Sequence, residues 1–444
     1  MRVLLVSTYE LGHQPLHLAS PAARLLADGH EVRCLDLAVE EWDADLFAWA
    51  EKVAFSVPMH TAMRLAVQAV NRLRQQRSDV PVAFYGLYAG IGADPAHRIV
   101  GEYEDELSAW VSGSVSQGPV VVDLGKTSYL KPARHLLPSL DRYAKLEIGG
   151  ERLLAGYVEA SHGCRHRCRH CPIPAVYDGR YRVTGLETVL ADVAQLVEMG
   201  ARHVSFGDPD FLNAPRYALD VLREVSRTFP GLTFDITVKV EHVLDHSEIW
   251  EEVAALGVVF VVSAFETTND RVLGLLDKGH IASDMSAATK ILQSVGIAVR
   301  PSWLPFTPWT ESRDLADIMQ FLADHDLLVS TDPVQLTIRL LLPEGSLLLD
   351  LPETAAALEG YDADLLTHIW RAARPAVDEL QADLALLAEL GGADQWTTID
   401  AMWDRVMPGS DPPARSDRIV PRLTEAWFCC AEPTTLQLAA VKRT

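Results

Sequence analysis

Three closely spaced cysteines are the residues of this sequence best suited to metal chemistry. Cys164, Cys168 and Cys171 are separated by three and then two residues, and they follow directly on the apolar run 153–158. This order predicts a loop between a strand and a helix that gathers three thiolates. Thiolates are soft donors that suit iron–sulfur clusters or zinc, and three of them leave one corner of a four-metal cluster open for an exchangeable ligand.

A structural zinc site is the alternative for these cysteines. One of three neighbouring histidines, His162, His166 or His170, would then complete a tetrahedron. Closed zinc sites normally pair two short C-x-x-C hairpins, and the sequence has no second hairpin of this kind near the first. We therefore favour the open cluster.

The cysteine spacing resembles the signature of the radical S-adenosylmethionine superfamily, which follows the first strand of a partial (β/α) barrel. The resemblance implies that each cysteine binds one iron of a 4Fe-4S cluster and that the fourth iron chelates the amino and carboxylate groups of S-adenosylmethionine. The residue before the last cysteine is usually aromatic in the family. Here it is His170, which the resemblance therefore places among the cofactor-binding residues.

Further cofactor-binding residues are expected at the carboxyl ends of later barrel strands. The segment 206–213 stands where the family has a Gly-Gly-Glu motif, so Gly207 and Asp208 are expected to contact the methionine amino group. Ser263 and Glu266, after a later strand, are expected to bind ribose or carboxylate, and Arg300 is a further candidate.

Residues 1–125 predict a doubly wound parallel α/β sheet, because short apolar runs alternate with helical patterns. The expected strands are 2–7, 32–37, 52–57, 82–86 and 120–123, and the expected helices lie near 18–28, 60–77 and 92–112. Preceding a radical S-adenosylmethionine core, this domain resembles a cobalamin-binding domain. The D-x-H-x-x-G motif of that family is missing, and the nearest segment runs from Tyr9 to His17. Cobalamin is thus a candidate cofactor, with a purely structural domain as the alternative.

The rest of the chain divides by pattern. We expect a linker over 126–152, an open (β/α)6 barrel over 153–345, a helical region over 346–426 and a tail over 427–444. The expected barrel strands are 153–159, 203–207, 232–239, 258–265, 297–304 and 334–341, and the accessory region is expected to hold helices over 363–390 and 395–406.

The tail carries two adjacent cysteines, Cys429 and Cys430, in the run Cys-Cys-Ala-Glu-Pro. This ending resembles that of a radical S-adenosylmethionine group recognised by the same tail, in which the first cysteine is sometimes selenocysteine. We expect a catalytic role for the pair. The two cysteines would either hold a soft metalloid such as arsenite over the cluster or donate a hydrogen atom or electrons to a substrate radical. An inert tail is the remaining alternative.

The net charge and the hydropathy pattern of the chain limit the kinds of partner that we expect. The chain has 39 Lys and Arg against 61 Asp and Glu, a formal net charge of −22, which disfavours nucleic acid and favours a small-molecule substrate. No apolar run has membrane-spanning length and no signal peptide is evident, so we expect a cytoplasmic protein without a membrane partner. Five arginines around the cysteines offer a docking surface for a flavodoxin or ferredoxin-type electron donor, or form a solvated loop; they are Arg165, Arg167, Arg169, Arg180 and Arg182.

These features together predict an enzyme of the transferase class. It would cleave S-adenosylmethionine reductively and modify or transfer a carbon group to a small molecule. Cobalamin-dependent methyl transfer to an unactivated carbon is one alternative, and a metal-binding redox sensor without turnover is another.

Overall fold

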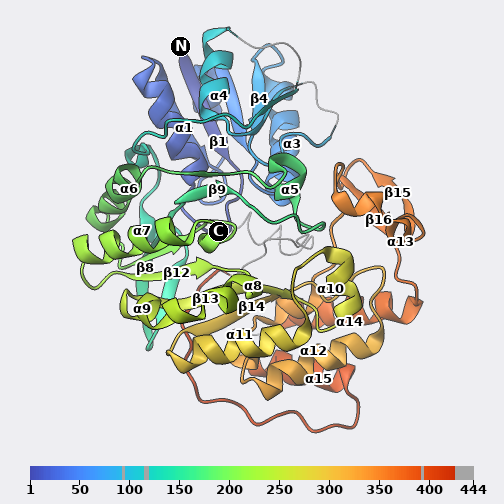
Figure 1. The fold of residues 1–444 in the computed structure, drawn as a ribbon. Helices are drawn as coiled ribbons and strands as arrows, with labels where there is room; N and C mark the ends of the chain where they lie inside the picture. The colour runs from blue at the N-terminus through green and yellow to red at the C-terminus, as the bar shows by residue number, and fades with distance from the viewer. Residues whose placement is uncertain (93–95, 115–119, 392–394, 426–444) are drawn as a thin grey trace.

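The computed structural model describes residues 1–92, 96–114, 120–391 and 395–425. Two β-sheets lie one above the other in Figure 1, with the strand β9 (Ser161–Gly163) and the helix α5 (Pro172–Tyr177) between them. The fold class is the one expected, an amino-terminal parallel α/β sheet followed by a curled half-barrel and helices. Within the described ranges, no helix is both long and apolar enough to cross a membrane.

The amino-terminal sheet has six strands in the order β2-β1-β3-β4-β5-β6, and all neighbours are parallel. The order reverses beside β1, which creates the switch point where such sheets bind ligands. The strands are β1 (Arg2–Ser7), β2 (Glu31–Asp36), β3 (Lys52–Ser56), β4 (Val82–Tyr85), β5 (His97–Gly101) and β6 (Val120–Asp123).

Helices cover both faces of this sheet because successive strand residues point to opposite sides. Leu4 and Val6 of β1 belong to one apolar core, and Val3 and Leu5 belong to another. The helix α3 packs on the first core, and α1 and α4 pack on the second. The helices are α1 (Leu16–Ala27), α2 (Ala44–Trp49), α3 (His60–Gln76) and α4 (Glu104–Ser112).

The second sheet has the order β14-β13-β12-β11-β8-β7-β17. Its neighbours from β14 to β8 are parallel, and β7 and β17 extend the edge in antiparallel pairing. The strands are β7 (Lys145–Ile148), β8 (Glu151–Val158), β11 (His203–Phe206), β12 (Thr233–Thr237), β13 (Val258–Glu266), β14 (Ala298–Trp303) and β17 (Arg422–Leu423).

Helices cover the outer face of this curled sheet, and β9 pairs with a short strand, β10 (Tyr181–Val183). The largest apolar core of the described residues fills the space between these helices and the sheet. The helices are α6 (Leu186–Glu198), α7 (Pro215–Thr228), α8 (Val240–Asp245), α9 (Trp250–Ala255), α10 (Asp270–Leu276), α11 (Ala282–Ser294) and α12 (Ser312–Asp324).

The prediction of a sixth barrel strand over 334–341 is wrong. The residues Pro333–Thr337 form a 3-10 helix, and only a single bridge joins Phe306 to Arg339. The side chain of Gln335 explains the difference, because its Oε1 accepts the backbone N–H of Trp303 on β14 at 3.2 Å. This side chain takes the bond that a sixth strand would have made.

Two expected helices are also corrected. The first half of 92–112 contains β5, and only Glu104–Ser112 is helical. Within 363–390, helix α14 begins at Pro375 and ends at Leu390, because a hairpin of β15 (Leu358–Asp362) and β16 (Thr367–Trp370) precedes it. The carboxyl-terminal region also holds α13 (Pro352–Ala355) and α15 (Gln395–Val406).

The hairpin of β15 and β16 reaches across to the amino-terminal domain. Its turn residue Leu366 is buried in an apolar core of that domain, and the Leu366 carbonyl lies 3.2 Å from His60 Nε2. The segment 126–152 is likewise anchored. The guanidinium of Arg134, 1% exposed, makes a bidentate pair with Asp192 on α6 at 2.9 and 2.8 Å. The same side chain also donates to Gln14 Oε1 at 3.1 Å, so one residue connects both domains.

Candidate active site

The carboxyl ends of both sheets face one cavity of about 340 Å³. Glu10, Gly86 and Tyr103 line it from the amino-terminal domain, and Leu423 and Glu425 line it from the end of the described chain. Its volume lies in the range of small-molecule sites. Most of the residues predicted from the sequence meet here: Cys164, Cys168, Cys171, His170, Gly207, Asp208, Glu266 and Arg300.

Neighbouring backbone and side chains fix the cysteine loop between β9 and α5. Cys164 N donates to the Arg180 carbonyl at 3.2 Å, and Cys171 N donates to the Cys168 carbonyl at 3.2 Å. Asn213, after β11, accepts from Arg165 N at 3.0 Å. Burial raises the pKa of the Cys164 thiol to about 11, so this thiol must release a proton when it binds a metal. The donor set fits an iron–sulfur cluster with three protein ligands.

The three histidines considered for a zinc site each lie against a carboxylate. These contacts orient the imidazoles toward acidic partners, so the structure gives no support to a closed zinc knuckle in the described residues. The pairs are His162 Nε2 with Glu159 at 3.2 Å, His166 Nε2 with Asp210 at 3.3 Å and His170 Nε2 with Glu266 at 3.0 Å.

Glu266 ends β13 in a left-handed conformation, with a φ of 64°, and faces the cavity. Its Oε1 accepts from His170 Nε2 at 3.0 Å and from Lys278 Nζ at 3.1 Å. Burial by itself would raise the pKa of Glu266, but the charges of Lys278 and His170 lower it far below its usual value. Glu266 is therefore ionised. The backbone strain of a non-glycine residue at positive φ is typical of functional sites.

Gly207 and Asp208 follow β11 in different environments. A Cβ atom at Gly207 would lie 2.0 Å from the Tyr157 ring, so this position requires glycine. The Asp208 carboxylate accepts from Ala160 N at 2.9 Å and from Ser161 Oγ at 2.5 Å, and burial raises its pKa to about 7. Asp208 therefore already anchors the turn that enters the cysteine loop, and its contact with a methionine amino group remains a prediction.

Ser263 and Arg300 differ in their access to the cavity. Ser263 is buried and donates to the Val238 carbonyl at 2.8 Å, and it is not among the residues that line the cavity. Arg300 lines the cavity and pairs with Asp332 at 2.6 Å. Of these two candidates, only Arg300 is placed to meet a ligand.

A buried acid–base array between the two domains was not predicted. His17 lies 3.1 Å from Glu10 and 3.4 Å from Glu159, and His162 lies 3.2 Å from Glu102. Burial by itself would lower the pKa of His17, but the carboxylates of Glu10 and Glu159 raise it to about 9. Burial by itself would raise the pKa of Glu159, but His17 and His162 lower it to about 2. Glu10 is seven residues from His17, but Glu159 is distant in sequence from His17 and Glu102 is distant from His162, so no local pattern reveals the array.

His13, on the same loop as Glu10, is a neutral imidazole at the cavity wall. Burial lowers its pKa to about 4, and its ring lies 4.6 Å from the Tyr157 ring. Nearby, Tyr9 Oη donates to Glu425 Oε1 at 3.0 Å, which holds the end of the described chain against the cavity. Cys429 and Cys430 lie outside the described residues.

The arginines around the cysteines are largely engaged by local partners. Arg167 pairs with Asp178 at 2.9 Å, and Arg169 donates to the Leu275 carbonyl at 3.0 Å. Arg165 and Arg182 donate to backbone carbonyls at 3.1 and 2.9 Å. These contacts favour the interpretation of a structured loop, and docking of an electron donor remains a prediction.

The cysteine loop lies within a segment that matches a known protein family. The family model described as the Radical SAM superfamily matches residues 158–322. This segment is a radical SAM domain. Enzymes with this domain use a 4Fe-4S cluster and S-adenosylmethionine, in agreement with the donor set of the loop.

Related proteins align with part of this chain. A hopanoid C-2 methylase of Rhodopseudomonas palustris (strain TIE-1) is 25% identical over 293 residues, which cover 62% of this chain and 53% of that protein. The ribosomal protein uS12 methylthiotransferase RimO of Desulforamulus reducens is 32% identical over 110 residues, which cover 22% of this chain and 24% of that protein. The chain thus spans about half of the length of the methylase and less of the methylthiotransferase.

Solved structures support the combination of a radical SAM domain with an amino-terminal sheet. OxsB, a cobalamin-dependent S-adenosylmethionine radical enzyme solved with aqua-cobalamin and S-adenosylmethionine bound, matches with a TM-score of 0.65 and 11% identity over 90% of this chain and 70% of that chain. The radical S-adenosylmethionine methyltransferase TsrM from Kitasatospora setae matches with a TM-score of 0.57 and 18% identity, over 73% and 71% of the two chains. At these identities the likeness concerns the fold.

Proposed function

We propose that this protein is a radical S-adenosylmethionine enzyme that transfers a carbon group, in the simplest case a methyl group, to a small-molecule substrate with cobalamin as second cofactor. The observation that carries the proposal is the shared cavity, because the three cysteines and the carboxyl edge of the amino-terminal sheet line the same space. Two cofactors bound at these two edges would meet each other and the substrate. The methylase relative and the fold of OxsB support the same proposal.

The cysteine loop and a nearby lysine would hold the cluster and balance its charge. Cys164, Cys168 and Cys171 would hold the cluster, which when bound supplies one electron to the sulfonium of S-adenosylmethionine. Lys278 is 3% exposed. Burial by itself would lower the pKa of its ammonium group, but Glu266 and the sulfur atoms of Cys168 and Cys171 raise that pKa above its usual value. Its ammonium group would therefore offset the negative charge of the thiolates.

Other residues would shape the space for the cosubstrate. Glu266 offers an ionised oxygen to the ribose or amino group, and Gly207 leaves room for the Tyr157 ring, which packs closely against it at the cavity wall. Arg300 would contact a carboxylate. The ion pairs of His17 with Glu159 and of His162 with Glu102 connect the two domains in a largely buried setting, and low solvent access strengthens electrostatic contacts.

Cobalamin would bind at the switch point of the amino-terminal sheet. Glu10 and Leu11 after β1 and Pro58 and Met59 after β3 line the cavity there. The same edge continues with Gly86 after β4 and Gly101 at the end of β5. The neutral imidazole of His13 is a nitrogen donor on the same edge. Identity of 25% to the methylase over half of its length does not carry the hopanoid substrate over to this chain.

A second candidate concerns the tail cysteines. Glu425 lines the cavity, and Cys429 is four residues further along the chain. Cys429 and Cys430 lie outside the described residues, so this candidate rests on the sequence of the tail and the soft-donor chemistry of adjacent thiols. In this version the pair holds a metalloid such as arsenite or quenches a substrate radical.

An anaerobic product assay tests these proposals. The reconstituted protein is given reductant, S-adenosylmethionine labelled in its methyl group and cobalamin, with Cys164→Ala as the control. Formation of 5′-deoxyadenosine together with cobalamin-dependent consumption of the labelled methyl group supports methyl transfer. Methylthioadenosine with arsenite-dependent turnover that is lost in Cys429→Ser supports the second candidate. If neither product exceeds the control, both enzyme proposals fail and a sensor without turnover is left.

A further inference from the structure

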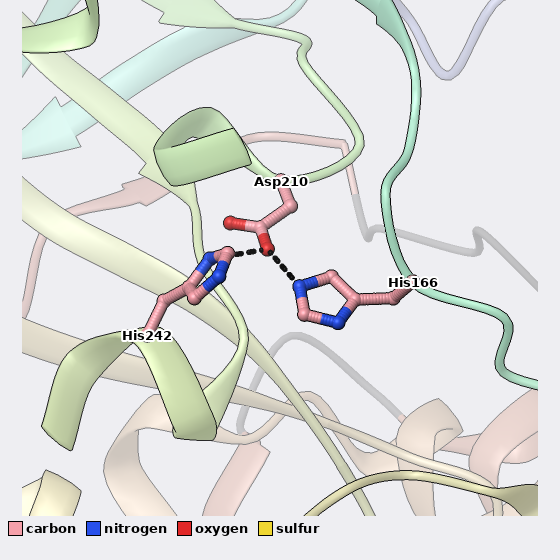
Figure 2. A group of neighbouring side chains, drawn as sticks. All are labelled: His166, Asp210 and His242. Carbon is pink, nitrogen blue, oxygen red and sulfur yellow. Dashed lines mark ion pairs between the residues drawn. The ribbon is translucent and has the colours of Figure 1, made fainter. Parts of the chain in front are cut away.

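A second group of metal-binding side chains lies beside the cysteine loop. His166 comes from the loop itself, Asp210 follows β11 and His242 lies on α8, and Figure 2 shows the carboxylate between the two imidazole rings. Asp210 Oδ2 is 3.3 Å from His166 Nε2 and 2.7 Å from His242 Nδ1. The three donor atoms all lie within 4.8 Å of one another.

The three facing atoms are buried without satisfactory hydrogen bonds. Asp210 is 0% exposed and His242 is 9% exposed. The atoms Asp210 Oδ2, His166 Nε2 and His242 Nδ1 each lack a hydrogen bond to any described residue, although they are in close contact. The other oxygen of Asp210 is used, since Oδ1 accepts from Leu212 N at 3.2 Å. Buried polar atoms are rarely left in this state, and a shared cation would satisfy all three.

The spacing and the chemistry of the donors select the kind of cation. Zinc binds histidine nitrogen and carboxylate oxygen at about 2.0–2.2 Å, which puts neighbouring ligands of a tetrahedron about 3.3 Å apart. The contact of Asp210 with His166 at 3.3 Å matches this separation. The contact with His242 at 2.7 Å is shorter, so metal binding would move the His242 ring away from the carboxylate. Two imidazoles with one carboxylate suit zinc, iron(II) or cobalt(II), whereas calcium and magnesium prefer oxygen ligands alone.

We propose that His166, Asp210 and His242 bind one divalent transition metal, with zinc as the first candidate, at a site separate from the cluster of the three cysteines. The surroundings of His166 support this site. Its second ring nitrogen, Nδ1, lies 3.7 Å from Glu241 Oε2, and a carboxylate near the outer nitrogen of a histidine ligand is typical of metal sites.

The site would give the cysteine loop a second anchor. His166 is two residues from both Cys164 and Cys168, whereas Asp210 and His242 follow neighbouring strands, β11 and β12. A metal shared by the three residues ties the loop to the rim of the barrel at this point. The metal is thus a structural ion that holds the loop in position, and it needs no redox change and no substrate.

The test uses the full-length protein with its iron–sulfur cluster installed. The protein is incubated anaerobically with zinc chloride, desalted and analysed for zinc, iron and sulfide. We expect about one zinc per chain in addition to the cluster iron. Zinc X-ray absorption should show nitrogen and oxygen neighbours at about 2.0–2.2 Å. A zinc–sulfur distance of about 2.3 Å would place the metal on cysteines and overturn the proposal.

Matched variants locate the ion. Asp210→Asn and His242→Ala should lose the zinc while retaining iron and sulfide, and that retention shows that the chain is folded. His246→Ala removes a histidine close to His242, with ring centroids 5.9 Å apart, and should keep the zinc. Cys164→Ala should lose the cluster and keep the zinc. If the wild type takes up no zinc, or if Asp210→Asn retains it, the three side chains form a hydrogen-bonded array and no metal site exists. Because zinc content is measured without turnover, this result is separate from the product assay above.

Discussion

The carboxylate oxygen Oε1 of Glu266 lies 3.1 Å from Lys278 Nζ and also accepts from His170 Nε2. All three side chains are buried, and His170 directly precedes Cys171. The strained end of β13 is therefore coupled to the cysteine loop through one ion pair and one hydrogen bond. This coupling gives the first prediction.

Replacement of Lys278 by Met should leave the Glu266 carboxylate buried without its cation. We expect the free energy of unfolding to fall by about 3–5 kcal/mol, the usual result of breaking a buried pair on one side. Urea unfolding measures the change, and Lys290→Met, at an exposed position of α11, is the control. The double variant Lys278→Met with Glu266→Gln should recover part of the loss; a double variant less stable than the single one would contradict the explanation.

Arg134 should be essential to the junction of the two domains. Arg134→Met leaves Asp192 without its bidentate partner in a buried position, and we expect a loss of about 3–5 kcal/mol in the free energy of unfolding. Arg134→Lys keeps the charge but cannot donate in two parallel bonds, so it should restore only a fraction. Thermal unfolding of the two variants provides the comparison. Equal stability of Arg134→Lys and the wild type would show that the charge alone is sufficient.

The contribution of His17 should depend on pH. Its folded pKa of about 9 lies above the ordinary value of 6.5, so its stabilising effect is complete below pH 6.5 and disappears as the pH rises through 9. The shift corresponds to roughly 3 kcal/mol at most. The difference in unfolding free energy between the wild type and His17→Gln should therefore shrink from pH 6 to pH 9.5. The exposed residue His135, changed to Gln, is the control; a difference that does not vary with pH would count against the charged pairing.

Gly207→Ala should disturb the cavity wall. The added Cβ would lie 2.0 Å from the Tyr157 ring, whose hydroxyl donates to Glu159 at 2.7 Å. Moving this ring should cost about 1–3 kcal/mol in stability, as overpacking usually does, and should weaken S-adenosylmethionine binding measured by calorimetry. Gly185→Ala is the matched control, since its new Cβ would meet nothing closer than 3.9 Å. Wild-type affinity and stability of Gly207→Ala would refute the steric argument.

The sequence by itself determined the features that depend on local spacing. Three cysteines within eight residues predict a metal-binding loop from their spacing alone. The alternation of apolar runs with helical patterns predicts parallel strands covered by helices. The residues after strands, such as Gly207 and Glu266, were expected at the cavity because the carboxyl ends of parallel strands share one edge. These predictions needed no knowledge of distant partners.

Tertiary structure decided the rest, because the deciding contacts join residues far apart in the chain. The side chain of Gln335 bonds to the backbone of β14 where the sequence predicts a sixth strand. Leu366 is buried in a core of the amino-terminal domain, and it lies in a hairpin where the sequence predicts a helix. Ser263 turns to a backbone carbonyl instead of the cavity. The pairs of His17 with Glu159 and of His166 with Asp210 arise from folding alone, since a buried charge takes whichever partner the packing brings within reach.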